Sequence, residues 1–403
     1  MNRVIFHIDV NNAFLSWSAV YLLKQGYKDI REIPSIIGGD ETKRRGIVLA
    51  KSPPAKRYKI ETAETIYSAK QKCKNLEVYP PNYKWYSEKS KELMNYLSKY
   101  SPVLEQLSID ECFLDMTGMK YIYKDLIKLA YEIKENIKNN FGYTVNIGIA
   151  NNKLCAKMAS DFEKPDKVHT LFNDEIETKL WPLPVGDLYM CGKKTKEKLN
   201  HIGIYTIKDL AKAEKKQLEK IFNKQGIYLH NAAWGIDESS VEKKESKNRS
   251  ISTTETLPYN YTDKIELKKI LFKQVEDITR QLRNKGLYTK TIGIIYKNSN
   301  FITNSYQITL DNATNNTKEI LNKIIELFEN SYNGDEIRLI GVKLSSLTKD
   351  NIKQITIFEE KSSEKTDNIQ NILDKINNEF NKNIIKPASL KMLEEKEERL
   401  SKK

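Results

Sequence analysis

The sequence has no long apolar run and little cysteine. Nowhere do its 403 residues form an unbroken apolar stretch of about 18–20 residues, the length of a membrane helix, so an integral membrane protein is excluded. The first apolar segment meets a carboxylate at Asp9, too early for a secretory signal. The four cysteines, Cys73, Cys112, Cys155 and Cys191, lie far apart without a CxxC pair. Their spacing argues against a disulfide framework or a zinc site and favours a reducing cytoplasm.

Acidic residues are in the minority. Sixty-seven Lys and Arg residues against 54 Asp and Glu residues give a net charge of +13. Such an excess favours polyanionic partners, because neutralising phosphates releases counterions. Nucleic acid is the leading candidate, although an anionic membrane surface would also attract this chain and an AT-rich genome would by itself enrich lysine. Charge alone therefore does not select the partner.

Hydrophobic periodicity predicts alternating strands and helices in the first part of the chain. Residues 3–8 are apolar and β-branched and predict a strand that ends at Asp9. Residues 121–140 carry apolar side chains at spacings of three and four, which predicts an amphipathic helix. Residues 144–149 alternate as a strand, and 107–115 predict two short strands that meet at an acidic turn.

Composition divides the rest of the chain. Residues 172–242 predict short helices interrupted by proline and glycine, and residues 243–249 have no apolar side chain and predict an exposed linker. The stretch 250–348 has patterns in the order β-α-β-β-α-β, that of a split βαβ motif. Its strands are predicted at 250–257, 291–296, 306–310 and 337–344, and its helices at 264–285 and 318–332.

Three carboxylates stand where predicted strands end. Asp9 follows the first strand, and the adjacent Asp110 and Glu111 occupy the acidic turn, with apolar residues on both sides. Adjacent strand residues point to opposite faces, but at a tight turn two neighbours can converge with an acid from the next strand end. Clustered carboxylates repel unless a cation neutralises them, and paired Mg²⁺ ions held in this way catalyse phosphoryl and nucleotidyl transfer. Ordinary turn acids are the alternative interpretation.

The same residues lie in motifs that resemble a known family. His7-Ile8-Asp9, followed by Phe14, and the string Ser108–Asp115 (SIDECFLD) are similar to the motifs of Y-family translesion DNA polymerases, closest to the DNA polymerase IV type. The string Asn152–Pro165 (NKLCAKMASDFEKP) resembles the segment ahead of the catalytic lysine of that family. The resemblance extends from about residue 1 to 348.

The resemblance implies an α+β, multidomain fold in the form of a right hand. It implies a ferredoxin-like palm, small fingers, a helical thumb with a helix-hairpin-helix, and a split-βαβ little finger that binds DNA. The implied parts are the palm at 1–10 and 82–171, the fingers at 11–81, the thumb at 172–242, the linker at 243–249, the little finger at 250–348 and a tail at 349–403.

The resemblance also implies an activity. It implies low-fidelity, template-directed DNA synthesis past lesions, in DNA repair and damage tolerance, without proofreading. Two Mg²⁺ ions, for which Mn²⁺ can substitute, would assist nucleotidyl transfer from a dNTP to the primer 3′-hydroxyl. The implied partners are primer-template DNA and dNTPs, and the implied state is a monomer in a bacterial cytoplasm, associated with the nucleoid.

The family pattern assigns roles to the matching acids. Asp9 and Asp110 would bind the metals, together with the backbone carbonyl of Val10. Glu111 would complete the site near the primer 3′-hydroxyl.

The pattern also implies residues that contact the nucleotide. The ring of Phe14 would exclude a ribose 2′-hydroxyl as a steric gate, and a core aromatic at a helix start is the alternative. Lys164 would contact the triphosphate as a point charge, and an exposed lysine before Pro165 is the alternative. Ala13 replaces a frequent aromatic beside the gate, which could widen the pocket.

The fingers depart from the family pattern. The family usually has a Tyr and an Arg that contact the triphosphate, and Pro53 and Lys56 stand at those positions here. Lysine cannot form the bidentate fork that arginine forms with phosphate, so nucleotide affinity is weaker or Arg57 substitutes.

Two further segments resemble contact sites of the family. Residues 190–199 (MCGKKTKEKL) resemble a helix-hairpin-helix, in which Gly192, Lys193, Lys194 and Thr195 would present N–H groups to a DNA phosphate. Lys194 stands where a second glycine is usual, and a lysine-rich helix start is the alternative.

In the tail, residues 354–358 (QITIF) resemble a sliding-clamp peptide. Gln354, Ile357 and Phe358 would dock in a groove of the clamp, and a final strand or a tail packed on the last domain is the alternative.

Two other classes of function are alternatives to a DNA polymerase. A nucleotidyl cyclase would share paired acids on a palm-like fold, but it leaves the thumb, the last domain and Phe14 unexplained. A non-enzymatic DNA-binding repair accessory would require a decayed site, whereas all three acids and Lys164 are present.

Overall fold

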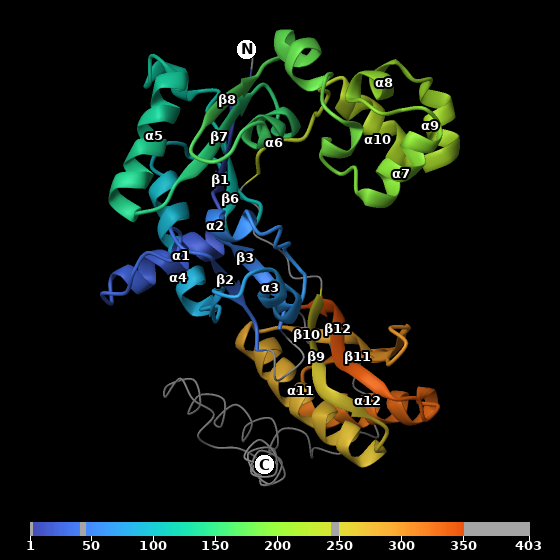
Figure 1. The fold of residues 1–403 in the computed structure, drawn as a ribbon. Coiled ribbons are helices and arrows are strands. Elements are labelled where there is room, and N and C mark those ends of the chain that lie inside the picture. The colour runs from blue at the N-terminus through green and yellow to red at the C-terminus, as the bar shows by residue number, and fades with distance from the viewer. Residues whose placement is uncertain (1–2, 41–45, 243–249, 350–403) are drawn as a thin grey trace. The chain divides into compact units, whose positions relative to one another are not determined.

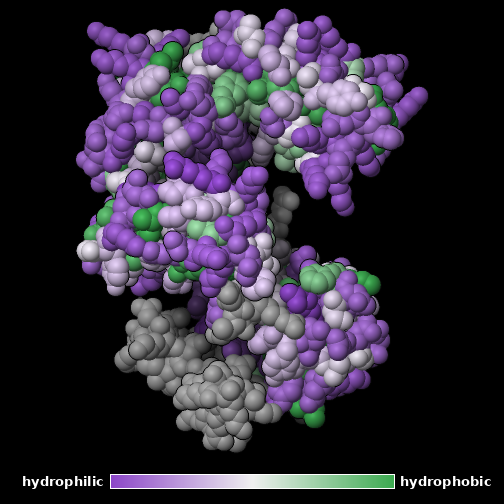
Figure 2. Space-filling view, in the orientation of Figure 1, coloured by the Kyte–Doolittle hydropathy of each residue, from purple (hydrophilic) through white to green (hydrophobic). Residues whose placement is uncertain are grey.

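The computed structural model describes residues 3–40, 46–242 and 250–349. These residues form two compact units, one up to residue 242 and one from residue 250 (Figure 1). Figure 2 shows a mainly hydrophilic surface with scattered apolar side chains, in keeping with a chain in which 30% of the residues are charged. In the described part of the chain, no helix is both long and apolar enough to cross a membrane.

The centre of the first unit is a five-stranded sheet in the order β5-β6-β1-β7-β8. Strand β1 pairs antiparallel with both β6 and β7 and lies between them. It begins and ends two residues later than predicted, because its pairing continues to Val10, so Asp9 lies inside the strand and not beyond its end. The strands are β1 (Ile5–Val10), β5 (Leu104–Gln106), β6 (Glu111–Asp115), β7 (Val145–Ala150) and β8 (Val168–Leu171).

Helix α5 connects β6 to β7. It spans Leu126–Phe141, whereas the periodicity predicted a start at residue 121. The difference has a local cause: the Asp125 side chain accepts a hydrogen bond from the backbone N–H of Lys128, which fixes the N-cap, and a short 3₁₀ turn precedes it. Gly142 ends the helix with a φ of 78°, a conformation that favours glycine.

The two faces of this sheet differ in chemistry. One face is apolar, with Phe6, Ile8 and Ile147 among its buried residues. It packs on helices α1 (Ala13–Leu23), α4 (Tyr83–Leu97) and α5. The opposite face carries polar residues of β1 and β6, and helix α6 (Lys153–Asp161) covers it. Alternation along the strands therefore separates a hydrophobic core from a polar layer.

A smaller sheet and a helical segment complete the first unit. The sheet has the order β3-β2-β4, with a core of its own. Its elements are β2 (Ser35–Gly38), β3 (Val48–Lys51), β4 (Glu77–Tyr79), α2 (Pro53–Lys56) and α3 (Ile66–Lys72). The helical segment comprises α7 (Lys193–His201), α8 (Ile207–Lys212), α9 (Lys215–Phe222) and α10 (Lys224–Ala233).

The second unit confirms the predicted order β-α-β-β-α-β. Its sheet has the order β11-β10-β12-β9, with every neighbouring pair antiparallel. Strands β9 and β10, joined by α11, are therefore parallel to each other with β12 between them, which is a split βαβ. The elements are β9 (Ser250–Tyr261), α11 (Lys264–Asn284), β10 (Tyr288–Asn298), β11 (Thr303–Thr314), α12 (Thr317–Ser331) and β12 (Ile337–Thr348).

The sheet of the second unit has one helix-covered face and one polar face. Apolar residues such as Ile294 and Val342 pack against α11 and α12. Their strand neighbours point to the other face, and many of these are exposed and bear hydroxyl, amide or ammonium groups. We call this surface the hydroxyl face; its exposed residues include Ser250, Ser252, Thr254, Thr303, Ser305, Gln307, Thr309 and Lys343.

Candidate functional site

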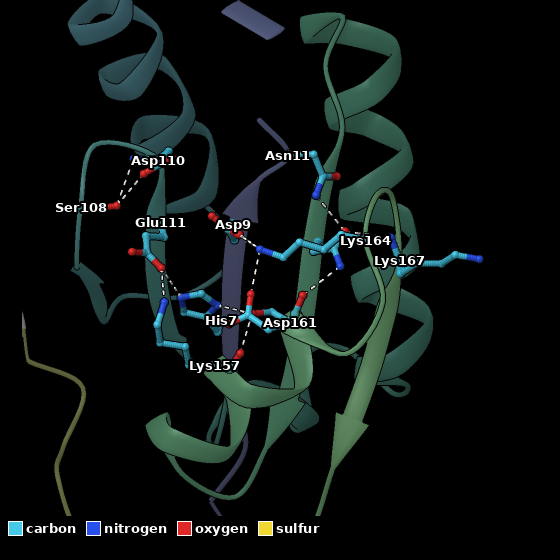
Figure 3. A network of polar contacts seen from close by, with 12 residues as sticks. His7, Asp9, Asn11, Ser108, Asp110, Glu111, Lys157, Asp161, Lys164 and Lys167 are labelled. Carbon is cyan, nitrogen blue, oxygen red and sulfur yellow. Dashed lines mark hydrogen bonds and ion pairs between the residues drawn. The ribbon is translucent and has the colours of Figure 1, made fainter. Parts of the chain in front are cut away.

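The candidate site lies on the polar face of the five-stranded sheet. Asp9 on β1 and Glu111 on β6 are direct partners in the antiparallel register (Figure 3). His7 shares their face because side chains alternate along a strand. Asp110 is the last residue of the turn that precedes β6. Strand register thus places Asp9 and Glu111 side by side, and Asp110 directly precedes Glu111 in the sequence.

Asp9 is paired with a lysine from the loop after α6. Its Oδ2 atom accepts a hydrogen bond from Lys164 Nζ, and the same ammonium group lies 2.8 Å from Asp161 Oδ1 (Figure 3). Burial raises the pKa of Asp9, and this effect outweighs the lowering by Lys164. Burial lowers the pKa of Lys164, but Asp9 and Asp161 outweigh it and leave that pKa raised.

Glu111 receives two donors on one oxygen. His7 Nε2 lies 3.1 Å from Glu111 Oε2, and Lys157 Nζ of α6 contacts the same oxygen (Figure 3). The hydrogen bond from His7 lowers the pKa of Glu111 to about 2, against a smaller opposing effect of burial and with the help of Lys157. Glu111 is therefore ionised throughout the neutral range.

His7 itself is completely buried. Its exposed fraction is 0%, and burial lowers its pKa. Its Nδ1 atom lies 2.8 Å from Ser160 Oγ, and that hydroxyl is also 2.7 Å from the carbonyl oxygen of Lys157. The imidazole thus connects α6 to the carboxylate of Glu111.

Asn146 on β7 positions the loop that carries Lys164. It is the register partner of Asp9, and its Nδ2 atom donates to the carbonyl oxygens of Glu163 (2.6 Å) and Ser160 (2.9 Å). Sequence reasoning missed Asn146 and also His7, Lys157 and Ser160. The available signal was a buried polar residue inside an otherwise apolar strand, since such a group needs a partner.

Asp110 has a different environment. Its Oδ1 atom accepts a hydrogen bond from Ser108 Oγ at 2.6 Å, and its backbone carbonyl accepts one from the Val10 N–H at 3.1 Å. These bonds fix the turn against the end of β1. The metal-binding role of the Val10 carbonyl stays a prediction.

The donor set fits a hard divalent cation. Among the described residues, no three His, Cys, Asp or Glu side chains already form a metal-binding group. The acids offer carboxylate oxygens from β1, from β6 and from the turn before β6, the donors that Mg²⁺ or Mn²⁺ prefers. Lys164 on Asp9 and Lys157 on Glu111 supply positive charge to the same acids. A bound cation would therefore compete with Lys164 for Asp9.

Phe14 lies in the first turn of α1 within an aromatic cluster. Its ring stacks on that of Tyr86, with centroids 4.7 Å apart and an interplanar angle of 11°, and meets the edge of Tyr83. Tyr86 is fully buried, and its hydroxyl lies 2.6 Å from Ser18 Oγ. Phe14 is only partly buried, so one aromatic surface is fixed while part of the ring stays accessible. The neighbouring Ala13 is buried.

The other predicted residues lie elsewhere on the first unit. Lys56 and Arg57 are exposed at the end of α2, whose N-cap is Ser52. Gly192 is the N-cap of α7, and Lys193, Lys194 and Thr195 form its first turn, with both lysines exposed. Residues 354–358 lie outside the described part of the chain.

The hairpin before α7 contains a strained residue. Met190 has a φ of 69° and is 56% exposed. Its carbonyl oxygen accepts a hydrogen bond from Gln225 Nε2 at 3.2 Å, which ties the hairpin to α10.

Comparisons with known proteins agree along the length of the chain. Residues 8–161 match the impB/mucB/samB family, and residues 248–357 match the C-terminal domain of that family. Residues 187–237 match the thumb domain of DNA polymerase-iota.

Individual relatives are similar over nearly the full chain. The DNA polymerase IV of Clostridium acetobutylicum is 42% identical over 98% of this chain and 100% of its own length. That of Alkaliphilus oremlandii is 37% identical over 97% of this chain and 99% of its own. A solved Y-family DNA polymerase chimera, Dbh-Dpo4(243-245)-Dbh, has a similar fold with a TM-score of 0.75 at 23% identity, covering 86% of this chain and 100% of that one.

Proposed function

The chain belongs to the Y family of DNA polymerases, the impB/mucB/samB family, and on this premise we propose how its residues carry out the reaction. It is a DNA-directed DNA polymerase of the translesion class and uses divalent metal ions. One observation carries the proposal: β1 and β6 place Asp9 opposite Glu111, beside Asp110, with lysines on two of the three acids.

Asp9 and Asp110 bind the metal ions in this proposal, with the carbonyl of Val10 as a further ligand. Two Mg²⁺ ions, replaceable by Mn²⁺, supply Lewis-acid stabilisation of the attacking and leaving oxygens. Glu111, which is ionised at neutral pH, orients the primer 3′-hydroxyl at the edge of this pair. The carboxylate donors and their burial support the assignment.

Lys164 binds the triphosphate. Its ammonium group contacts Asp9 in the protein alone, and it would be available to the phosphate oxygens once a cation neutralised Asp9. Lys56 and Arg57, exposed on α2, supply further positive charge from the fingers.

Phe14 selects the sugar. A ring that Tyr86 holds in place leaves no room for a ribose 2′-hydroxyl, whereas a deoxyribose fits against it. Discrimination in this proposal is steric, and it depends on the rigidity of the ring.

DNA is bound through its backbone by two surfaces. Gly192, Lys193, Lys194 and Thr195 offer the N-terminus of α7 to a phosphate. On the second unit, the hydroxyl face offers mainly short hydroxyl donors together with Gln307 and Lys343. The palm at 1–10 and 82–171, the fingers at 11–81, the thumb at 172–242 and the little finger at 250–348 are the corresponding parts.

We further propose a sliding clamp as a partner. Gln354, Ile357 and Phe358 would bind it as an extended peptide, and the polymerase itself would be a monomer in the bacterial cytoplasm, associated with the nucleoid.

Primer extension tests the metal-site assignment. We expect Asp110→Ala to reduce extension by more than the roughly 10- to 100-fold that loss of an outer hydrogen-bond partner of a ligand costs, because a metal ligand itself is lost, while a gel-shift assay still detects the primer-template complex. Asp174→Asn, at an exposed acid outside the site, serves as the control and should extend normally. Wild-type protein is compared on undamaged and abasic templates with Mg²⁺ and each dNTP in turn.

Near wild-type extension by Asp110→Ala would overturn the metal-site assignment. Extension only on undamaged DNA would retain the polymerase site and contradict lesion bypass. No extension by the wild-type protein, with DNA still bound, would favour the accessory function.

A further inference from the structure

The buried imidazole of His7 is not explained by any role proposed so far. Two residues before Asp9, it occupies the polar layer between the sheet and α6, and it is as inaccessible as the apolar core. A polar ring is costly to bury unless both nitrogens find partners. Here both do: Nε2 has Glu111 as its partner (Figure 3), and Nδ1 has Ser160.

The two contacts form a chain from a helix to an acid. Ser160 lies on α6 and His7 on β1, 153 residues apart in sequence, and Glu111 on β6 is 104 residues from His7. Phe113 packs against the ring at a centroid distance of 4.8 Å and restricts its rotation. Since Nε2 points at Glu111 Oε2, the ring orientation determines where that carboxylate can lie.

The number of protons on each group determines which atom donates in the two hydrogen bonds of His7. An ionised carboxylate only accepts, so Nε2 must carry the proton that binds Glu111. A neutral imidazole has one such proton, which leaves Nδ1 as an acceptor for the hydroxyl of Ser160. The hydroxyl has one proton, so donation to Nδ1 competes with donation to the carbonyl oxygen of Lys157, which lies 2.7 Å away on the same helix.

We propose that His7, oriented by Ser160, is a positioning residue that sets the carboxylate of Glu111 for the reaction. The inference rests on the proposed role of Glu111 near the primer 3′-hydroxyl. His7 touches neither substrate nor metal in this proposal. It acts through Glu111, in the way that outer hydrogen-bond partners orient the ligands of a metal site.

Single-turnover kinetics with primer-template and Mg²⁺ test the proposal. His7→Phe keeps a ring against Phe113 but removes both nitrogens, and we expect kcat to fall about 10- to 100-fold with the KM for dNTP unchanged. His7→Gln keeps an N–H group and should recover part of the loss. His169→Phe removes an imidazole from β8 of the same sheet and is the control, with kcat near that of the wild type.

Ser160 provides a coupling test. Ser160→Ala should lower kcat in the wild-type background and have no further effect in the His7→Phe background, because Ser160 acts through the ring. Additive losses, or an equal fall in His7→Gln and His7→Phe, would overturn the positioning role. Thermal unfolding of each variant identifies those that fail to fold.

A readout without turnover comes from ¹⁵N NMR of histidine-labelled protein, whose four histidines keep the spectrum simple. We expect the His7 proton on Nε2, and a proton on Nδ1 would overturn the hydrogen-bond assignment. Glu111→Ala distinguishes the proposed catalytic site from the proposed positioning role of His7. If it leaves extension intact, the assigned site fails; if it abolishes extension while His7→Phe keeps the wild-type kcat, only the role of His7 fails.

Discussion

At the residue scale, the site is organised by charges from distant parts of the chain. Lys164 is 155 residues from Asp9, and Lys157 is 46 residues from Glu111. Both acids lie in partly buried positions where repulsion between them would be strong without these partners. The two lysines therefore reduce the repulsion between the carboxylates of Asp9 and Glu111 in the protein alone. Because the lysines only pair with these acids, the carboxylates can still bind cations.

The steric gate gives a prediction at this scale. Phe14→Ala should abolish most discrimination against ribonucleotides, because it removes the ring that is proposed to meet the sugar. Tyr86→Ala should reduce discrimination by about 2- to 13-fold, since a stacked aromatic pair is worth about 0.5–1.5 kcal/mol in holding the ring. Tyr86→Phe keeps the stacking and should preserve discrimination. The measurement is the ratio of kcat/KM for a dNTP and the matching ribonucleotide.

Unchanged ratios in Phe14→Ala would remove Phe14 from the gate. A loss in Tyr86→Phe as large as in Tyr86→Ala would assign the effect to the hydroxyl bond with Ser18 instead of the ring.

At the element scale, the hairpin that precedes α7 places a strained residue close to a proposed DNA contact. Met190 occupies the left-handed region, where a side chain costs about 1–2 kcal/mol relative to glycine. Two residues later, Gly192 starts α7. The hydrogen bond from Gln225 to the Met190 carbonyl thus holds the hairpin in a left-handed backbone conformation that methionine disfavours.

Met190→Gly should therefore stabilise the first unit by about 1 kcal/mol. The measurement is the free energy of unfolding from urea titrations of the full chain. Met190→Ala, which keeps the strained φ with a smaller side chain, is the matched control and should bring no such gain. An equal gain in both variants would trace the effect to the loss of an exposed apolar side chain, and not to the backbone.

At the scale of the whole molecule, some of the lysines that give the net charge of +13 lie on the two proposed DNA-binding surfaces. Lys193 and Lys194 lie at one proposed DNA contact, and Lys343 lies on the hydroxyl face of the second unit. Both surfaces present mainly small or flexible donors, which suit phosphates, and phosphate contacts carry no sequence information. Binding without sequence readout is what a polymerase requires, since it must accept any template.

Salt dependence tests the contribution of the hydroxyl face. The affinity for primer-template should fall by about 0.9 log unit per log unit of salt for each phosphate contact. Lys343→Ala should reduce that slope by about 0.9 if the lysine neutralises one phosphate. Lys323→Ala removes the same charge from α12, on the helix-covered side, and should leave the slope unchanged. Equal slopes for the Lys343 variant and the wild type would remove this face from the DNA contact.

The proposed clamp peptide makes a second prediction at this scale. Replacing Ile357 and Phe358 by Ala removes the side chains that would fill an apolar groove. Synthesis without the clamp should be unchanged, whereas stimulation by a loaded clamp should be lost in a processivity assay. Lys353→Ala, just outside the peptide, should be stimulated normally. Stimulation that persists in the double variant would contradict the peptide assignment.

The sequence by itself determined the order of the elements and the identity of the acids. Periods of two and of three to four residues follow directly from strand and helix geometry, so the β-α-β-β-α-β order of the last unit could be read without coordinates. The ends of elements were less accessible. The start of α5 depended on a single cap at Asp125, and the end of β1 depended on its pairing with β7.

Only the tertiary structure decided which polar groups meet. Alternation places His7 and Asp9 on one face, but the register of β1 with β6 selects Glu111 as the residue opposite Asp9. The packing of α6 then brings Lys157 and Ser160 onto that face. The physical reason is that side-chain direction is a local property of the backbone, whereas the partner across a sheet or under a helix is set by the packing of the whole unit.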